Sequence, residues 1–310
     1  LDQGECWEVC LALWSAAFED IDQAIAAAAG LLQEGDFARR QVALGILSEI
    51  SVPRADEVLV YALDDPDLRL AAQALNRLAG DACVLDAPPD AFERVERLAR
   101  RLGHQRAGPG PAVPRGARLA AYGNALAAVL FKSLGDRPAL RLAPYVPLMN
   151  AGQRADFVRL IGQARPLDGP SRQGLLGLAA DRNRRVQEEA LAMLAGDGVP
   201  EADLIHLEGC LSAGRGAVRL GLIQFLLRRS DEQVLASARR LLEARNVQQR
   251  LAGLELLRLV LPELFLRGGD DAEIMFGVLI IVFGRDRVAG ALRVARELDV
   301  FFGEVGRRSA

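Results

Sequence analysis

A short arginine-centred pattern recurs along this chain at intervals of about thirty residues. Each copy has an arginine, a small or apolar residue three positions later and then large apolar residues, as in Arg40, Ala43, Ile46 and Leu47; Arg69, Ala72 and Leu75; Arg219, Leu222, Phe225 and Leu226; and Arg250, Gly253, Leu256 and Leu257. A fifth copy begins with glutamine instead: Gln187, Ala190, Met193 and Leu194. Repeats of this length are typical of stacked helical pairs, each of which buries its apolar face against its neighbours.

The composition supports an entirely helical fold. Of the 310 residues, 51% are hydrophobic and 25% charged, as in an ordinary folded protein. Alanine and leucine dominate, and β-branched residues never alternate over the length of a strand. Asp36 and Ser230 are placed as helix N-caps and Pro53 in a first turn. We therefore predict an all-α fold of stacked antiparallel helix pairs.

The charged residues do not favour a polyanionic partner. The formal net charge is −3, and Lys132 is the single lysine, so nearly all of the positive charge comes from arginine. Because alanine, glycine and arginine are all abundant, we attribute this bias to a GC-rich genome rather than to an arginine-lined site. The charge balance leaves no electrostatic footprint for nucleic acid or for an anionic membrane.

The chain carries no recognisable signal for secretion or membrane insertion. Its first residues include acids where a signal peptide has lysine or arginine. Its most apolar run, residues 274–283, is too short to cross a membrane, since a membrane-spanning helix needs about 20 residues. The four cysteines are too few and too scattered for a disulfide framework. We expect a cytoplasmic location and, since no methionine begins the sequence, a place within a longer bacterial protein.

One stretch resembles a known repeat closely. Within residues 55–78, a helix is followed by an Asp-Pro-Asp turn at residues 65–67 and by a second helix that carries Arg69 and Ala72. This arrangement resembles the HEAT repeat. Weaker copies occupy residues 181–194, 215–227 and 246–257. The resemblance implies an armadillo-type fold over most of the chain, in which antiparallel helix pairs stack into a right-handed superhelix.

A segment rich in proline and glycine interrupts the repeats. It contains Gly108-Pro109-Gly110-Pro111 and Pro114, which cannot lie inside a helix. Connections of this length are uncommon inside compact domains. We therefore predict helical repeats over residues 1–102, an exposed flexible loop over 103–116 and further helical repeats over 117–310.

No group of residues predicts an active site or a metal site. Cys6 and Cys10 share a helix face, as do His206 and Cys210, but neither pair has the further ligands that a metal ion needs. His104 is a distant third ligand at best, and we expect Cys6 and Cys10 to be small core residues. We expect no catalytic residue, no metal and no cofactor.

The arginines of the recurring pattern have two interpretations. Arg40, Arg69, Arg219 and Arg250 lie near the start of the second helix of a pair, where a guanidinium can bond to groups of the adjacent turn. The carboxylates placed to accept such bonds are those of Asp65, Asp67 and Asp181. Alternatively, the arginines line a groove and bind carboxylates or phosphates of a ligand. We favour the structural ladder, since HEAT-like families tend to carry such an arginine whatever they bind.

The C-terminal segment is apolar on all sides. Residues 274–283 have no polar face, and the apolar residues that follow are Val288, Leu292, Val294, Leu298, Val300, Phe301 and Phe302. A terminal repeat normally has a polar outer face. We expect an additional domain of the same chain, or another partner, to pack on these helices.

The function predicted from this architecture is binding. A stack of helical pairs presents a curved surface lined by the second helix of each pair. The exposed positions that we expect to contact a partner carry mixed charge and are Gln73, Arg77, Glu188, Gln224, Arg228, Glu255 and Arg258. We predict a non-enzymatic scaffold that binds another protein on its concave face.

Two alternatives belong to other classes of protein. The first is a nucleic-acid-binding protein similar to the HEAT-like alkylpurine DNA glycosylases, which need a basic concave face with aromatic residues near the lesion. Here the net charge is negative, and Trp7 and Trp14 lie in an apolar stripe that we expect to be core. The second is an accessory helical-repeat region of a larger enzyme, with its chemistry elsewhere.

Overall fold

Helices make up most of the described part of the chain. The computed structural model describes residues 3–80, 88–104, 120–163, 165–213 and 216–268. These ranges contain helices and no strand, which confirms the all-α prediction for them. The chain divides into two compact units, Leu1–Phe157 and Val158–Ala310, and the boundary falls inside α9 (Ala151–Ile161).

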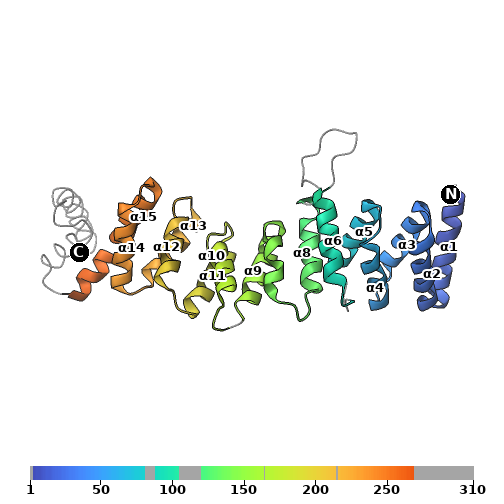
Figure 1. Cartoon of the computed structure of the whole chain (residues 1–310), viewed down its shortest axis with the longest axis horizontal. Coiled ribbons are helices and arrows are strands. Elements are labelled where there is room, and N and C mark those ends of the chain that lie inside the picture. Colours follow the sequence, from blue (N-terminus) through green and yellow to red (C-terminus); the bar gives the residue numbers. More distant parts are fainter. Residues whose placement is uncertain (1–2, 81–87, 105–119, 164, 214–215, 269–310) are drawn as a thin grey trace, which may run out of the picture. The chain divides into compact units, whose positions relative to one another are not determined.

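In the first unit, the helices follow one another side by side in sequence order (Figure 1). They are α1 (Gln3–Glu19), α2 (Ile21–Glu34), α3 (Phe37–Glu49), α4 (Pro53–Ala62), α5 (Leu68–Ala79), α6 (Ala91–His104), α8 (Gly123–Lys132) and the 3-10 helix η1 (Ala139–Leu148). Alternate helices also pack together, so that α1, α3, α5 and α8 form one layer in series. The helices α2, α4 and α6 form the other layer.

The second unit has the same arrangement of alternate helices. Its helices are α10 (Gly169–Leu178), α11 (Arg184–Gly196), α12 (Glu201–Cys210), α13 (Ala217–Leu227), α14 (Asp231–Glu243) and α15 (Val247–Gly268). One layer consists of α10, α12 and α14, and the other of α11, α13 and α15. The pairs α10–α11, α12–α13 and α14–α15 join the two layers.

Local sequence signals set where several helices begin. The Asp36 side chain accepts a hydrogen bond of 2.9 Å from the Arg39 amide, and Ser230 accepts one of 3.4 Å from the Gln233 amide. Pro53 occupies the first turn of α4, where its missing N–H leaves no hydrogen bond unmade. The three predicted helix starts are therefore confirmed.

Small residues of the recurring pattern bring neighbouring helices together. Ala43, Ala72 and Ala190 are no more than 2% exposed. At Gly253, a Cβ atom would lie 3.0 Å from the carbonyl oxygen of Ala238, so α15 approaches α14 closely at that point. Such close contact lets the aliphatic residues beside them fill the space between helices.

The apolar stripe of α1 is not core, contrary to the prediction from its periodicity. Trp7 is 65% exposed and Phe18 is 87% exposed, and Leu11 and Trp14 are also exposed. Among the side chains of α1 that the structure describes, Leu13 is the buried one, as the helix packs on α2 and α3. The expectation was wrong because α1 is apolar on two faces, and periodicity alone does not say which one is covered.

Two sequence predictions fall on residues outside the described ranges. The first is the loop at 103–116, of which only the end of α6 is described. The helices on either side of this segment, α6 and α8, pack against each other in the first unit. The division into 1–102 and 117–310 stays a prediction. The second is the apolar C-terminal segment, residues 274–302, which also lies outside them.

Candidate partner-binding groove

The arginines of the recurring pattern in the first unit bond to turns beside their helices. The Arg40 Nε atom lies 3.0 Å from a carboxylate oxygen of Asp65, which ties α3 to the turn before α5. Arg69 donates hydrogen bonds of 2.7 and 3.1 Å to Asp67, and its guanidinium lies 4.4 Å from the centre of the Phe37 ring. The hydrogen bonds from Arg69 lower the pKa of Asp67 to about 2.

In the second unit, the corresponding arginines have similar partners. Arg219 donates hydrogen bonds of 2.9 and 3.1 Å to Glu255 and one of 3.1 Å to the Gln248 carbonyl, so it ties α13 to α15. Arg250 donates to the two carbonyls that follow α14, at 3.2 and 2.9 Å. Each of these four arginines therefore bonds within its own unit.

Gln187, which replaces the arginine in the fifth copy, is completely buried. Its Nε2 donates to the Ala179 carbonyl at 3.1 Å and to the Val218 carbonyl at 2.9 Å, which joins the end of α10 to the start of α13. A Cβ atom on Gly221 would lie 2.3 Å from the Gln187 Oε1, so glycine lets α13 come this close to α11. A neutral amide bonded to carbonyls is also cheaper to bury than an unpaired guanidinium.

An open groove of about 310 Å³ lies beside Gln187, between α11 and α13. Its lining residues are Glu188, Leu191, Ala192, Ala195, Gly221, Gln224, Phe225, Arg228 and Arg229. Leu191 and Phe225 are each 5% exposed and form an apolar floor. The other side of the lining is polar. The structure thus brings together three of the predicted contact residues, Glu188, Gln224 and Arg228.

The two arginines at the groove have no carboxylate partner among the described residues. Arg228 is exposed. The Arg229 guanidinium lies over the Phe225 ring, 4.6 Å from its centre, and its buried Nε has no hydrogen-bond partner within the described ranges. Glu188 is already paired with Arg184 on its own helix, at 2.7 Å. The groove therefore offers two uncompensated positive groups beside an apolar floor.

The remaining predicted contact residues do not line this groove. On α5, in the first unit, Gln73 is exposed and Arg77 donates a hydrogen bond of 3.2 Å to a serine hydroxyl before α4. On α15, Glu255 is half-buried as the partner of the arginine on α13, and Arg258 is exposed. The predicted contact set is therefore divided between the two units.

Sequence reasoning missed the floor of the groove and one of its arginines. Leu191 carries no signal beyond its place on an amphipathic helix, and Phe225 is predicted only as a packing residue. Arg229 is absent from the predicted contact set. A usable signal exists, because Arg229 follows Phe225 by four residues, and this spacing places a guanidinium beside the ring on a helix surface.

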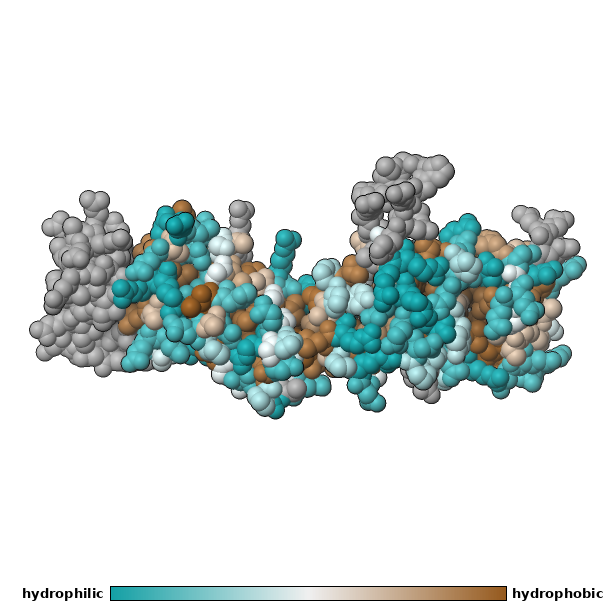
Figure 2. Space-filling view, in the orientation of Figure 1, coloured by the Kyte–Doolittle hydropathy of each residue, from teal (hydrophilic) through white to brown (hydrophobic). Residues whose placement is uncertain are grey.

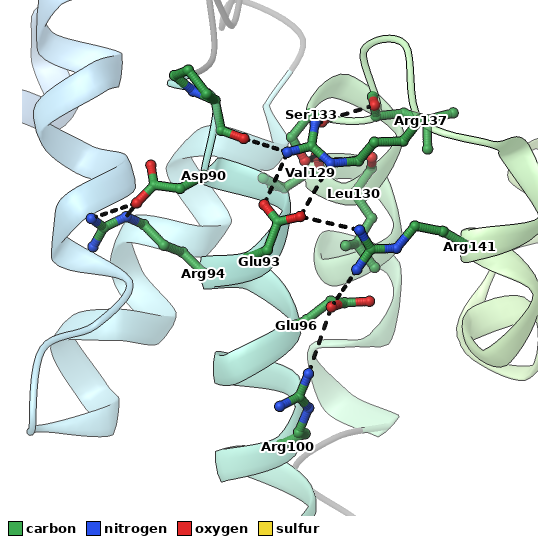
Figure 3. Close-up of polar contacts among 12 residues, drawn as sticks. Asp90, Glu93, Arg94, Glu96, Arg100, Val129, Leu130, Ser133, Arg137 and Arg141 are labelled. Atoms are coloured by element: carbon green, nitrogen blue, oxygen red, sulfur yellow. Dashed lines mark hydrogen bonds and ion pairs between the residues drawn. The ribbon is translucent and has the colours of Figure 1, made fainter.

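A second polar cluster joins α6 to η1 and to the turn before it in the first unit (Figure 3). Glu93 accepts hydrogen bonds from Arg137 at 2.9 and 3.2 Å and from Arg141 at 3.1 Å, and Arg141 also donates to Glu96 at 2.8 Å. Both guanidinium groups lie over the Phe92 ring, 5.5 and 4.6 Å from its centre. Hydrophilic residues gather over α6 on the face that Figure 2 shows.

The pKa of Glu93 reflects this pairing. Burial raises it, but the hydrogen bonds from Arg137 and Arg141 outweigh burial, so the pKa lies below its usual value. The charges of the cluster are therefore matched within the unit, and its chemistry is that of a structural connection between elements.

The cysteine and histidine candidates are not brought together. Cys6 and Cys10 are free and half-buried rather than core. Burial raises the pKa of the Cys210 thiol, and His206, one turn earlier, is exposed. The His104 side chain lies outside the described part. Nowhere in the described ranges do three His, Cys, Asp or Glu side chains gather as metal ligands. Of the helices described, none combines the length and hydropathy needed to cross a membrane.

Comparison with known proteins gives a family likeness for the part that contains the groove. Residues 123–263, somewhat less than half of the chain, match the model of a family described as a family of unknown function (DUF5724). The matched range begins with α8 and ends inside α15, so it includes both α11 and α13. No curated protein matches the chain. The groove is thus similar in sequence to a region of that family.

Proposed function

We propose that this chain is a non-enzymatic, HEAT-like scaffold that holds a segment of another protein in the groove between α11 and α13. The observation that carries the proposal is the meeting of Glu188, Gln224 and Arg228 at one apolar groove. These residues come from consecutive helices of one layer. A surface built by successive repeats is the usual binding surface of helical-repeat proteins.

Two features support the HEAT-like part of the proposal. Alternate helices pack in series in both units, as stacked helical pairs do. The first residues of the five copies also lie in a single layer of each unit: α3 and α5 in the first unit, and α11, α13 and α15 in the second. The proposal includes the right-handed superhelix that we expect of a HEAT-like array.

The groove favours a partner segment with an apolar side chain next to a carboxylate. Leu191 and Phe225 supply the apolar surface, while Arg228 and Arg229 supply donors in the planar geometry that matches a carboxylate. The volume of about 310 Å³ suits a few side chains rather than a folded domain.

The test is a selection of displayed peptides on the 310-residue chain, followed by affinity measurements on the selected peptides. We expect selection to enrich peptides that combine an acidic and an apolar residue. Two variants then challenge the site: Ala192→Trp fills the groove, and Arg228→Glu reverses its charge. Each should weaken binding at least about tenfold, since the first removes the space and the second places like charges together.

Matched control variants lie on α14, in the other layer. Ala236 and Arg239 are exposed there, so Ala236→Trp and Arg239→Glu make the same chemical changes away from the groove. These controls should bind the selected peptides as the unchanged chain does. If Ala192→Trp and Arg228→Glu also bind normally, the groove is not the binding site and the proposal fails.

A further inference from the structure

Helix α1 presents a continuous face of large apolar side chains to solvent. This α1 face consists of Trp7, Leu11, Trp14 and Phe18, which follow the spacing of one helix side. Their exposed fractions run from 37% at Trp14 to 87% at Phe18. The rings of Trp14 and Phe18 lie 6.3 Å apart, so they form one aromatic surface rather than separate side chains.

This face differs from ordinary surface hydrophobicity. Single exposed apolar residues need no explanation, whereas a contiguous patch of several hundred Å² marks an interaction surface. Trp7 and Trp14 are the only two tryptophans of the chain, and both are exposed. Tryptophan is among the residues that contribute most to binding at protein interfaces. Leu13, on the other side of α1, is 5% exposed and anchors the helix on α2 and α3.

The surroundings of the α1 face are acidic. The first 38 residues contain no lysine or arginine, and their acids are Asp2, Glu5, Glu8, Glu19, Asp20, Asp22, Glu34 and Asp36. Glu8 and Glu19 are exposed and lie along one flank of the aromatic residues on α1. Asp22 pairs with Arg54 at 2.8 Å, and Asp20 caps α2, but Glu8 and Glu19 have no basic partner among the described residues.

We propose that the α1 face binds an amphipathic helix of a protein partner whose apolar side carries large residues and whose flank carries arginine or lysine. Charge complementarity identifies this occupant, because Glu8 and Glu19 attract basic groups and repel acidic ones. The four apolar residues are spaced three or four positions apart on one side of α1, and this spacing suits a partner helix packed along its length. This surface belongs to α1 and is separate from the groove between α11 and α13.

The fluorescence of Trp7 and Trp14 can report binding at the α1 face. Because both tryptophans lie on the α1 face, covering the face should shift their fluorescence to shorter wavelength. The probe is a synthetic amphipathic helix with leucine on one side and arginine along its flank, without tryptophan. Its matched control has glutamate in place of each arginine. We expect a saturable blue shift with the arginine peptide and binding at least tenfold weaker with the glutamate peptide.

Substitutions on α1 separate the apolar and the charged contributions while they keep both reporters. Leu11→Ser with Phe18→Ser should abolish the shift, and Glu8→Lys with Glu19→Lys should reverse the preference toward the glutamate peptide. All four residues are exposed, so circular dichroism and thermal melts should stay unchanged. Control variants are Ile205→Ser and Glu57→Lys, at exposed positions away from α1, and these should bind as before.

Three results would overturn the proposal. Equal binding of the arginine and glutamate peptides would show that charge complementarity does not select the partner. A concentration-dependent blue shift without peptide, lost in the Phe18→Ser variant, would show that a second copy of the chain covers the face. An equal shift on phosphatidylcholine vesicles would assign the face to a lipid surface.

Discussion

The cluster between α6 and η1 and the groove between α11 and α13 both place arginine over a phenylalanine ring, but they differ in how the arginine is paired. In the cluster, Arg137 and Arg141 lie over the fully buried Phe92 ring, and both also bond to Glu93. In the groove, a guanidinium lies over Phe225 in the same manner, yet no carboxylate meets it within the described ranges.

The difference teaches where an arginine is structural and where it is available for a ligand. Where Glu93 accepts from two guanidinium groups, the charges are already satisfied and the arginines stabilise the contact between elements. Where a guanidinium contacts only an aromatic ring, its hydrogen-bond donors remain for a partner. The first region should therefore respond to substitution by losing stability, and the second mainly by losing affinity.

The largest expected effect concerns the shape of the groove. In Gly221→Ala, the new Cβ would lie 2.3 Å from the Gln187 Oε1, so either Gln187 or α13 must move. We expect a loss of about 2 kcal/mol in the free energy of unfolding, as for other overpacked core sites. Urea unfolding of the variant and the unchanged chain measures it, and selected groove peptides should bind more weakly.

A matched glycine provides the control for that substitution. Gly177 lies in α10 of the same unit, and a Cβ there meets nothing within 4 Å. Gly177→Ala should leave stability unchanged or raise it by about 0.5 kcal/mol, because alanine has less freedom in the unfolded chain. An equal loss at both positions would mean that the close approach of α11 and α13 is not the cause.

The next effect concerns the satisfied cluster. Glu93→Ala leaves Arg137 and Arg141 without their shared carboxylate, and we expect the free energy of unfolding to fall by about 1 kcal/mol. The control is Glu243→Ala, which removes an exposed ion pair with Arg239 within α14 and should cost under about 0.5 kcal/mol. Thermal melts of both variants check the difference. A cost no larger for Glu93→Ala would show that the cluster contributes little.

A smaller effect should appear on acidification. The pKa of Glu93 lies below its usual value because the hydrogen bonds from Arg137 and Arg141 outweigh burial, and the pKa of Asp64 is lowered in the same way by Arg97 and Arg94. A lowered pKa in the folded state adds stability above the unfolded value of about 4, and this is lost as the pH falls through the folded pKa. Urea midpoints should therefore decrease between about pH 5 and pH 3. In the Glu93→Ala variant the decrease should be smaller, and an identical pH dependence would contradict the role given to Glu93.

Helices and their contact positions could be predicted from the sequence, because the signals involved are local. Asp36 and Pro53 mark helix starts whatever the rest of the chain does, and the spacing of the recurring pattern places Glu188 and Gln224 on exposed sides of their helices. Contacts between residues about thirty positions apart depend on how α11 and α13 pack, and this packing cannot be deduced from local sequence signals. The exposure of Trp7 was missed for the same reason, since an apolar face does not name the element that covers it.

The smallest expected effect on stability also distinguishes the two regions most sharply. The Arg228 side chain is exposed and makes no ion pair or hydrogen bond within the described ranges, so Arg228→Glu should change the free energy of unfolding by no more than about 0.5 kcal/mol. The same variant should weaken peptide binding at the groove at least about tenfold, because a like charge then faces the ligand carboxylate. Urea unfolding and peptide titration on one protein preparation give both numbers. A substitution that spares folding and removes affinity marks a binding residue, whereas a large loss of stability would place Arg228 among structural arginines such as Arg137 and remove the contrast between groove and cluster.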